Sequence, residues 1–271
     1  MQGRLLPKYK GRFQAHPLGY WQDEFLIAAE IGLQCIEFIF DFNDYQLNPL
    51  WTVDGFKEIQ NISKETGIKV YSVCADFFME CPFHSECQDE RDLAILIAKK
   101  LIQNCSNLGI SDIVIPCVDQ SSLRSSSDIE IFTNQILNII PFAEKSGVNL
   151  ALETDLDPRS FKNLLHRLDS PLITVNYDTG NSASLGFDYL DELNAYYDRI
   201  SDLHIKDRLR GGASVSLGTG DFDLEGFFSK FDLDNFRGPV ILQCFRDSEG
   251  IEIFKKQLEW FYNILSKKLL I

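Results

Sequence analysis

Hydrophobic and polar positions along the 271-residue chain repeat one pattern, in which an amphipathic stretch ends at a glycine and an apolar run follows at once. Four segments show it: AAEIGLQCIEFIF, SKETGIKVYSVCA, CSNLGISDIVIPCV and AEKSGVNLALETD. A helix that ends in a left-handed glycine and leads into a strand produces this pattern. The apolar runs do not alternate strictly with polar residues, which predicts parallel strands that are buried on both faces.

Later apolar runs continue the repeat. They are LITVNYD (172–178), ISDLHIKD (200–207) and PVILQCF (239–245), with helix-like segments between them. With GRLL (3–6) as the first strand, the predicted strands number eight. Eight strands alternating with helices in a chain of this length predict a (β/α)8 TIM barrel, a single α/β domain over residues 1–271. An open doubly wound sheet is the alternative, and it is less favoured because no glycine-rich phosphate-binding loop follows an early strand.

Charge and composition narrow the class of partner and the compartment. The net charge is -14 and the pI about 4.7, so a nucleic acid would be repelled unless a local basic patch overrode the field. The first residues lack the apolar core of a secretory signal, and no run of eighteen apolar residues occurs, which predicts a cytoplasmic protein with no membrane partner. Seven cysteines, an odd number, indicate reduced thiols rather than a disulfide framework.

Polar residues stand at the ends of several of the predicted strands. They are Glu37, Asp76, Glu153, Asp178, His204 and Gln243. In a barrel of parallel strands the carboxyl ends meet on one face, where the chemistry is carried out. An ionised side chain buried there costs several kcal/mol unless it is paired or bound to a cation.

Three of these residues come from successive strands and would meet. Glu153, Asp178 and His204 supply two carboxylates and an imidazole, which predicts one divalent metal ion: Mn, Mg, Co, Fe or Zn. Gln243, from the next strand, would place a neutral amide oxygen, a weak ligand, at a fourth corner. The alternative is a set of polar groups that hydrogen-bond to one another inside the barrel.

With these residues in place, the sequence resembles the xylose isomerase-like TIM-barrel superfamily of sugar and sugar-phosphate isomerases and epimerases over nearly its whole length. The matching pieces are GLQCIEFIF, VYSVCADFF, LALET, NYDTGN, LHIKD and LGTGDFDLEGFF. The resemblance implies a sugar or sugar phosphate as the small-molecule partner and is compatible with a homo-oligomer. It also implies a metal site of Glu, Asp, His and Glu, which carries over to Glu153, Asp178 and His204, with Gln243 at the last position. The family's endonuclease branch is disfavoured because the chain has only four histidines and an acidic charge.

Gln243 departs from the family pattern in a way that bears on mechanism. In relatives with two acid/base residues, the first and last glutamates transfer protons on opposite faces of an enediolate. An amide does not titrate near neutral pH, so Glu153 is the one predicted base. One-base isomerisation or dehydration is therefore favoured over two-base epimerisation. The alternative is a noncatalytic or regulatory sugar-binding barrel that has lost turnover.

Four further residues are predicted to bind the substrate. Asp76, Asn181, Lys206 and Arg246 would orient hydroxyl groups or a phosphate. Lys206 shares a strand face with His204 because side chains alternate along a strand, although pairing with Asp178 or Asp207 is an equal alternative. Phe77, Phe78 and Phe83 are predicted to form an apolar wall over the pocket.

Overall fold

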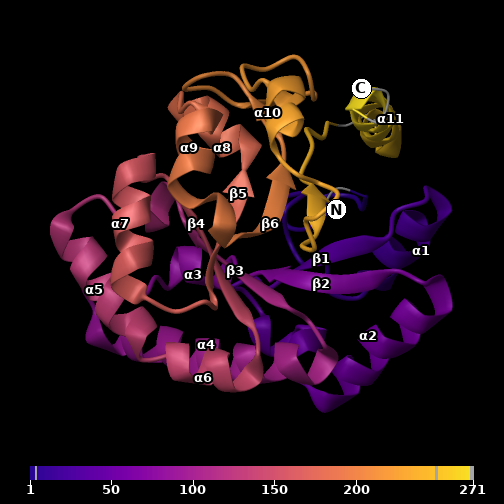
Figure 1. Ribbon diagram of the computed structural model, residues 1–271. Coiled ribbons are helices and arrows are strands. Elements are labelled where there is room, and N and C mark those ends of the chain that lie inside the picture. Colours follow the sequence, from indigo (N-terminus) through magenta and orange to yellow (C-terminus); the bar gives the residue numbers. More distant parts are fainter. Residues whose placement is uncertain (4, 248–249, 269–271) are drawn as a thin grey trace.

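Seven parallel strands form the centre of the protein. The computed structural model describes residues 1–3, 5–247 and 250–268. In it one sheet has the order β1–β2–β3–β4–β5–β6–β9 and curls into a nearly closed barrel with helices outside (Figure 1). The strands are β1 (Cys35–Ile39), β2 (Lys69–Cys74), β3 (Asp112–Cys117), β4 (Asn149–Thr154), β5 (Ile173–Asp178), β6 (Ile200–Ile205) and β9 (Val240–Leu242). The predicted α/β barrel in a single domain is confirmed.

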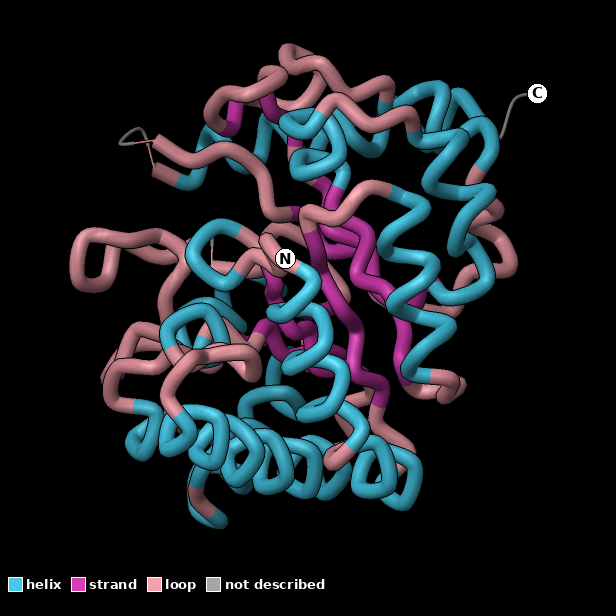
Figure 2. Tube along the Cα trace, turned by 90° about the vertical axis from the view of Figure 1, so that its left-hand side faces the viewer, coloured by secondary structure: helices cyan, strands magenta, loops and turns pink. Residues whose placement is uncertain are grey.

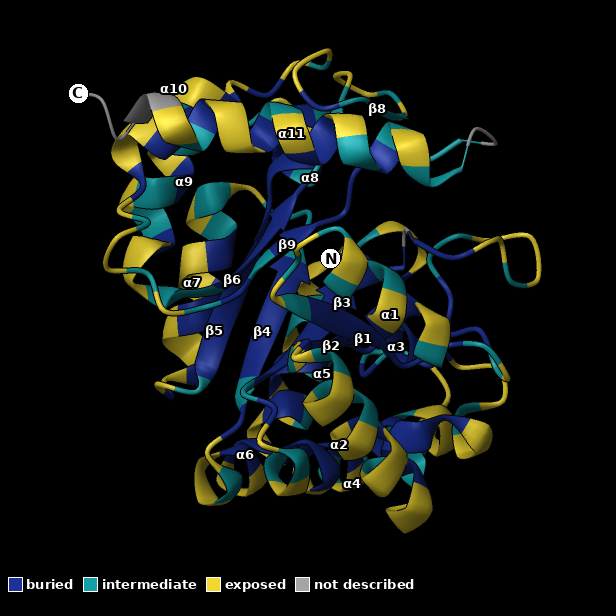
Figure 3. Cartoon of the chain, turned by 90° about the vertical axis from the view of Figure 1, so that its right-hand side faces the viewer, coloured by how far each residue is buried: buried dark blue, intermediate teal, exposed yellow. Residues whose placement is uncertain are grey.

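Helices surround the strands on the outside of the barrel (Figure 2). They are α1 (Gln22–Glu30), α2 (Val53–Thr66), α3 (Phe77–Glu80), α4 (Gln88–Leu108), α5 (Ser126–Leu137), α6 (Ile140–Ser146), α7 (Pro158–Leu168), α8 (Thr179–Leu185), α9 (Tyr189–Tyr196), α10 (Leu224–Lys230) and α11 (Ile251–Lys268). Strands β4, β5 and β6 are buried, whereas the outer faces of the helices are exposed (Figure 3). Among the described helices, none has both the length and the apolar character needed to cross a membrane.

The predicted eighth strand at residues 3–6 is wrong. Gly3 has a left-handed backbone (φ 57°) that interrupts an extended run, and Arg4 lies outside the described residues. The chain nevertheless enters the gap between β1 and β9. The backbone N–H of Glu37 donates to the Met1 carbonyl (2.7 Å), and that of Gln2 donates to the Leu242 carbonyl (3.5 Å). An irregular segment thus lies where an eighth strand was expected.

Glycines end the helices as the repeat predicts. Gly67, Gly109 and Gly147 follow α2, α4 and α6 directly, with φ of 77°, 72° and 66°. This left-handed geometry carries no Cβ penalty in glycine, and it turns the chain from each helix into the next strand.

The register of β5 and β6 determines which polar side chains face the barrel interior. Asp178 and His204 are directly paired across the two strands, and so are Asn176 and Asp202. A bulge shifts the register between Val175 and Asn176. Because side chains alternate along each strand, Asn176 and Asp178 share one face of β5, and Asp202 and His204 share one face of β6.

Candidate metal and sugar site

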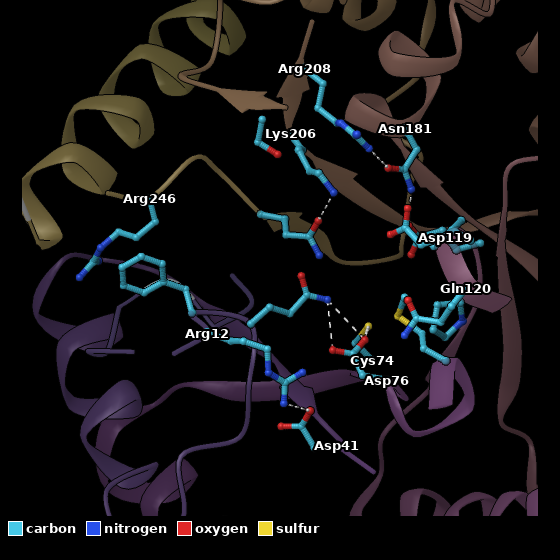
Figure 4. Close-up of a pocket in the computed structure, with 18 of the residues that line it drawn as sticks. Arg12, Asp41, Cys74, Asp76, Asp119, Gln120, Asn181, Lys206, Arg208 and Arg246 are labelled. Atoms are coloured by element: carbon cyan, nitrogen blue, oxygen red, sulfur yellow. Dashed lines mark hydrogen bonds and ion pairs between the residues drawn. The ribbon is translucent and has the colours of Figure 1, made fainter. Parts of the chain in front are cut away.

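A cavity of about 580 Å³ opens at the carboxyl ends of the strands. The residues that line it lie at or beyond the carboxyl ends of β1 to β6 and β9, together with the N-terminal loop (Figure 4). They include Asp76, Glu153, Lys206 and Gln243. This end of a parallel barrel is where active sites of the fold lie.

The three residues predicted to form a metal site lie together at the base of the cavity, where Glu153 lines it and Asp178 and His204 are buried beneath. His204 Nδ1 lies 3.8 Å from Glu153 Oε2 and 3.9 Å from Asp178 Oδ2. One ligand atom from each residue lies within 4.8 Å of the other two. Atoms that each bind one ion at ~2.1 Å lie roughly 3–3.5 Å apart, so each of the two distances from His204 Nδ1 would need to shorten by a few tenths of an ångström. The cluster therefore has the donor types and the spacing to bind a metal ion.

Asp178 is held by the start of α8 and by a lysine. Its Oδ1 accepts hydrogen bonds from the backbone N–H groups of Gly180 (2.8 Å) and Asn181 (2.9 Å), which caps the helix. Its Oδ2 lies 3.3 Å from Lys206 Nζ. Burial opposes ionisation, but the positive charges of Lys206 and His204 outweigh it and lower the pKa of Asp178. Asp178 is therefore an ionised donor.

Glu153 reaches the cavity and is hydrogen-bonded on both carboxylate oxygens. Asn176 Nδ2 donates to Oε2 (3.0 Å), and Asn181 Nδ2 donates to Oε1 (2.5 Å). Arg208 in turn donates to Asn181 Oδ1 (3.2 Å; Figure 4). Glu153 is buried, with 7% of its surface exposed. Burial and the neighbouring charge of Asp178 raise the pKa of Glu153 to about 7. A carboxylate of this pKa can take up and release a proton near neutral pH.

His204 is fully buried among carboxylates. Burial alone would lower its pKa, but Glu37, Glu153 and Asp202 raise the pKa of His204 to about 10. In the metal-free protein these carboxylates favour the protonated imidazole. A metal ion at Nδ1 would take the place of that proton.

Gln243 is buried at the side of the same cluster. Its Oε1 accepts a hydrogen bond from Lys206 Nζ (2.8 Å), and its Nε2 donates to Gln2. Lys206 thus pairs with Asp178, which is one of the two pairings left open by the sequence. Asp207 instead accepts backbone hydrogen bonds from Gly218 and Gly220. The amide oxygen of Gln243 is directed at an ammonium group.

The other residues predicted to bind substrate all line the cavity. Asp76 accepts hydrogen bonds from Gln14 Nε2 (3.2 Å) and Cys74 Sγ (3.2 Å), and burial raises the pKa of Asp76 to about 6. Asn181 lies beside Glu153, as described above. The Arg246 guanidinium lies 5.0 Å from the centre of the Phe13 ring.

The predicted apolar wall is wrong. Phe77, Phe78 and Phe83 are at most 1% exposed and do not line the cavity. Phe78, on α3, packs on Phe83 in the segment after the helix, with ring centres 4.5 Å apart in the core. No pattern in the sequence indicated the loop residues Arg12, Gln14 and Asp41, which also line the cavity, since a loop has no periodicity that reveals where its side chains point.

Comparison with known proteins gives a consistent picture. A family model described as the xylose isomerase-like TIM barrel matches residues 25–264. L-ribulose-5-phosphate 3-epimerase UlaE of Salmonella heidelberg is 25% identical over 236 residues, which cover 84% of this chain and 83% of that protein.

Solved structures of low sequence identity share the fold. E. coli YcjR, a 3-keto-D-glucoside 4-epimerase in its apo form, superposes with a TM-score of 0.73 at 16% identity, covering 96% of this chain and 98% of that one. The IOLI protein with a bound zinc atom superposes with a TM-score of 0.72 at 18% identity, covering 91% and 92%.

Proposed function

The chain belongs to the xylose isomerase-like TIM barrel family, and from this premise we propose a divalent-metal-dependent isomerase or epimerase that acts on a sugar or sugar phosphate through an enediolate. One observation carries the proposal. The Glu153 carboxylate, with a pKa of about 7, stands on the cavity floor beside the buried donors Asp178 and His204. The name of the relative UlaE, a sugar-phosphate epimerase, supports the substrate class.

Glu153, Asp178 and His204 would hold the metal ion. Their donor set suits Mn, Mg, Co, Fe or Zn, and the amide of Gln243 would add a weak neutral contact at the fourth corner. When bound, the ion would polarise the substrate carbonyl and offset negative charge on its oxygen.

Glu153 is the proposed general base. It would remove a proton from the carbon next to the carbonyl, while Asn176 and Asn181 hold its two oxygens in place. Gln243 cannot take part in proton transfer because an amide does not titrate near neutral pH. One base on one face serves a 1,2-isomerisation or a dehydration more readily than an epimerisation, which delivers a proton to the opposite face.

Polar residues around the cavity would bind the rest of the substrate. Asp76, Asn181 and Lys206 would orient hydroxyl groups, and Arg246 would bind a phosphate together with Arg12. The seven cysteines are free thiols, which supports a reducing, cytoplasmic setting. The charge of -14 argues against nucleic acid as a substrate.

Two measurements test the function. Elemental analysis of the purified protein should find about one divalent metal ion per chain. The loaded protein, incubated in deuterium oxide with ribulose 5-phosphate, ribulose, fructose or tagatose, should place deuterium at a carbon next to the carbonyl of at least one of them, as mass spectrometry would detect.

A pair of matched variants tests whether Glu153 transfers the proton. Glu153→Gln should abolish deuterium exchange, whereas Glu80→Gln, at an exposed position on the same cavity, should leave it intact. The product then separates the reactions, since an aldose indicates isomerisation and an inverted ketose indicates epimerisation. Absence of metal and of exchange, even after dialysis against Mn²⁺, would overturn the proposal.

A sugar-binding barrel without turnover is the second candidate. The contact of Gln243 with Lys206 favours it, because the amide oxygen is already occupied and Gln243 itself supplies no base. This candidate predicts sugar binding by calorimetry with no deuterium exchange, and any exchange that depends on Glu153 excludes it.

A further inference from the structure

Glu37 lies below the cavity floor and has no part in the function proposed above. It belongs to β1, on the opposite side of the sheet order from β6, is 1% exposed, and does not line the cavity. Its Oε1 lies 2.9 Å from His204 Nε2. Neither of these two atoms has another hydrogen-bond partner among the described residues. Each can therefore be satisfied only by the other.

Glu37 is itself fixed from two sides. Ser72 Oγ on β2 donates to Glu37 Oε2 (2.7 Å), and the two residues are paired in the register of β1 and β2. The backbone N–H of Glu37 donates to Met1 (2.7 Å). The carboxylate thus has one oxygen held by a hydroxyl group and the other directed at the imidazole.

The two ring nitrogens of His204 face different groups. Nε2 faces Glu37, while Nδ1 lies 3.0 Å from Asn176 Nδ2 and 3.8 and 3.9 Å from the carboxylate oxygens of Glu153 and Asp178. A histidine that binds a metal through one nitrogen usually donates its other N–H to a carboxylate or carbonyl, which fixes the orientation of the ring. The Nε2 proton is present both in the imidazolium and in a neutral ring that binds metal through Nδ1.

We propose that Glu37 is the positioning residue of the site: it accepts the Nε2 proton of His204 and so directs Nδ1 at the metal position between Glu153 and Asp178. The inference rests on the proposed function, because it assigns a metal ion to Nδ1. It adds a residue from β1, across the gap from β9, that would touch neither substrate nor metal. Ser72 supports Glu37 in the same way that Glu37 supports the histidine.

Two substitutions at Glu37 separate hydrogen bonding from charge. Glu37→Met has a similar length but no acceptor, and we expect the dissociation constant for Zn²⁺ or Co²⁺, measured by calorimetry, to rise about 10- to 100-fold. Glu37→Gln keeps a carbonyl acceptor and should restore binding to within about threefold of the unmodified protein. Asp112→Asn is the control, because this buried carboxylate on β3 hydrogen-bonds with Ser111 and Asn149 and should leave the affinity unchanged.

A second measurement does not depend on metal. In metal-free protein labelled with ¹⁵N-histidine, the Nε2 proton of His204 should appear as a downfield, slowly exchanging NMR signal, assigned by its loss in His204→Asn. The signal should persist in Glu37→Gln and move upfield or disappear in Glu37→Met. If Glu37→Met does not fold, Ser72→Ala tests the same contact, since an unsupported carboxylate should shift the Nε2 proton signal.

The outcomes distinguish the inference from the proposed function. If the unmodified protein binds no metal, the proposed function fails, and the NMR signal still tests whether Glu37 holds the ring. Unchanged metal affinity and an unchanged Nε2 signal in Glu37→Met would overturn the inference. So would a second metal ion per chain that is lost in Glu37→Met, because Glu37, Asp202 and His204 also lie within 4.8 Å of one another and Nε2 would then be a ligand.

Discussion

Two regions supply the polar residues at the base of the cavity, and they position their side chains differently. One region is strands β4 to β6; the other is the junction of β6, β9 and the N-terminal segment. Glu153, Asp178 and His204 stand on neighbouring strands whose backbone hydrogen bonds set their relative height. Gln243 follows a strand of three residues, and its amide is held by the side chains of Lys206 and Gln2. A ladder of backbone hydrogen bonds positions the first group, whereas side-chain contacts position the second.

This difference bears on which changes the site can accept. The position of a strand residue depends on backbone hydrogen bonds that every side chain except proline preserves. A substitution of Glu153 or His204 should therefore remove a ligand while the strands stay in register. A change at Gln243 alters the partners of Lys206, which in turn contacts Asp178. Substitutions at Gln243 can therefore change the charge next to the metal position while Glu153, Asp178 and His204 stay in place.

The largest expected effect comes from removing a donor on the strands. His204→Asn should weaken metal binding at least about 100-fold, because it deletes the only imidazole of the cluster. Calorimetric titration with Zn²⁺ would measure the loss. His166→Asn, at an exposed position on α7, is the control. Equal affinity in both variants would contradict the assignment of the metal ligands to β4, β5 and β6.

A smaller effect is expected at the junction. Gln243→Glu should tighten metal binding by about tenfold, since a carboxylate is a stronger ligand than an amide, and Lys206 should limit the gain by pairing with the new charge. Competition with a chelator would measure it. Gln120→Glu adds the same charge at an exposed position on the cavity and should change the affinity little. A comparable gain in metal affinity in both variants would show that the added negative charge acts at long range and that residue 243 does not bind the metal directly.

The smallest effect is expected two contacts away from the base. Arg208→Gln should lower kcat about three- to tenfold with little change in KM, because Arg208 holds Asn181 against Glu153. Weaker support of the charged carboxylate raises its pKa, so the acidic limb of the pH–rate profile should move to higher pH. Arg167→Gln, exposed on α7, is the control. A change confined to KM would mean that Arg208 serves only to bind substrate.

The sequence predicted what depends on periodicity and on strand ends. Glycine-terminated helices and continuous apolar runs indicated the barrel, and the end of each strand indicated Glu153, Asp178 and His204. The first strand was predicted wrongly because an apolar pair of leucines resembles a strand, whereas a left-handed Gly3 and the following Pro7 prevent one.

The contacts across the barrel could not be predicted in the same way. Glu37 was visible as a strand-end residue, but its approach to His204 depends on how the barrel curls and not on any local spacing. Asp202 lies two residues before His204 and shares its face of β6, and this period of two was the one signal that could have revealed it. Loop residues such as Gln14 gave no signal at all.

Asp178 joins the metal position to the first turn of a helix. One of its oxygens faces the cluster, and the other accepts the N–H groups of Gly180 and Asn181. A cation on the first oxygen withdraws electron density from the second, so it weakens the acceptor on which these two amides depend. Amide hydrogen exchange at Gly180 and Asn181 should therefore quicken when the metal binds, and α8 would report whether the metal position is filled, without a substrate.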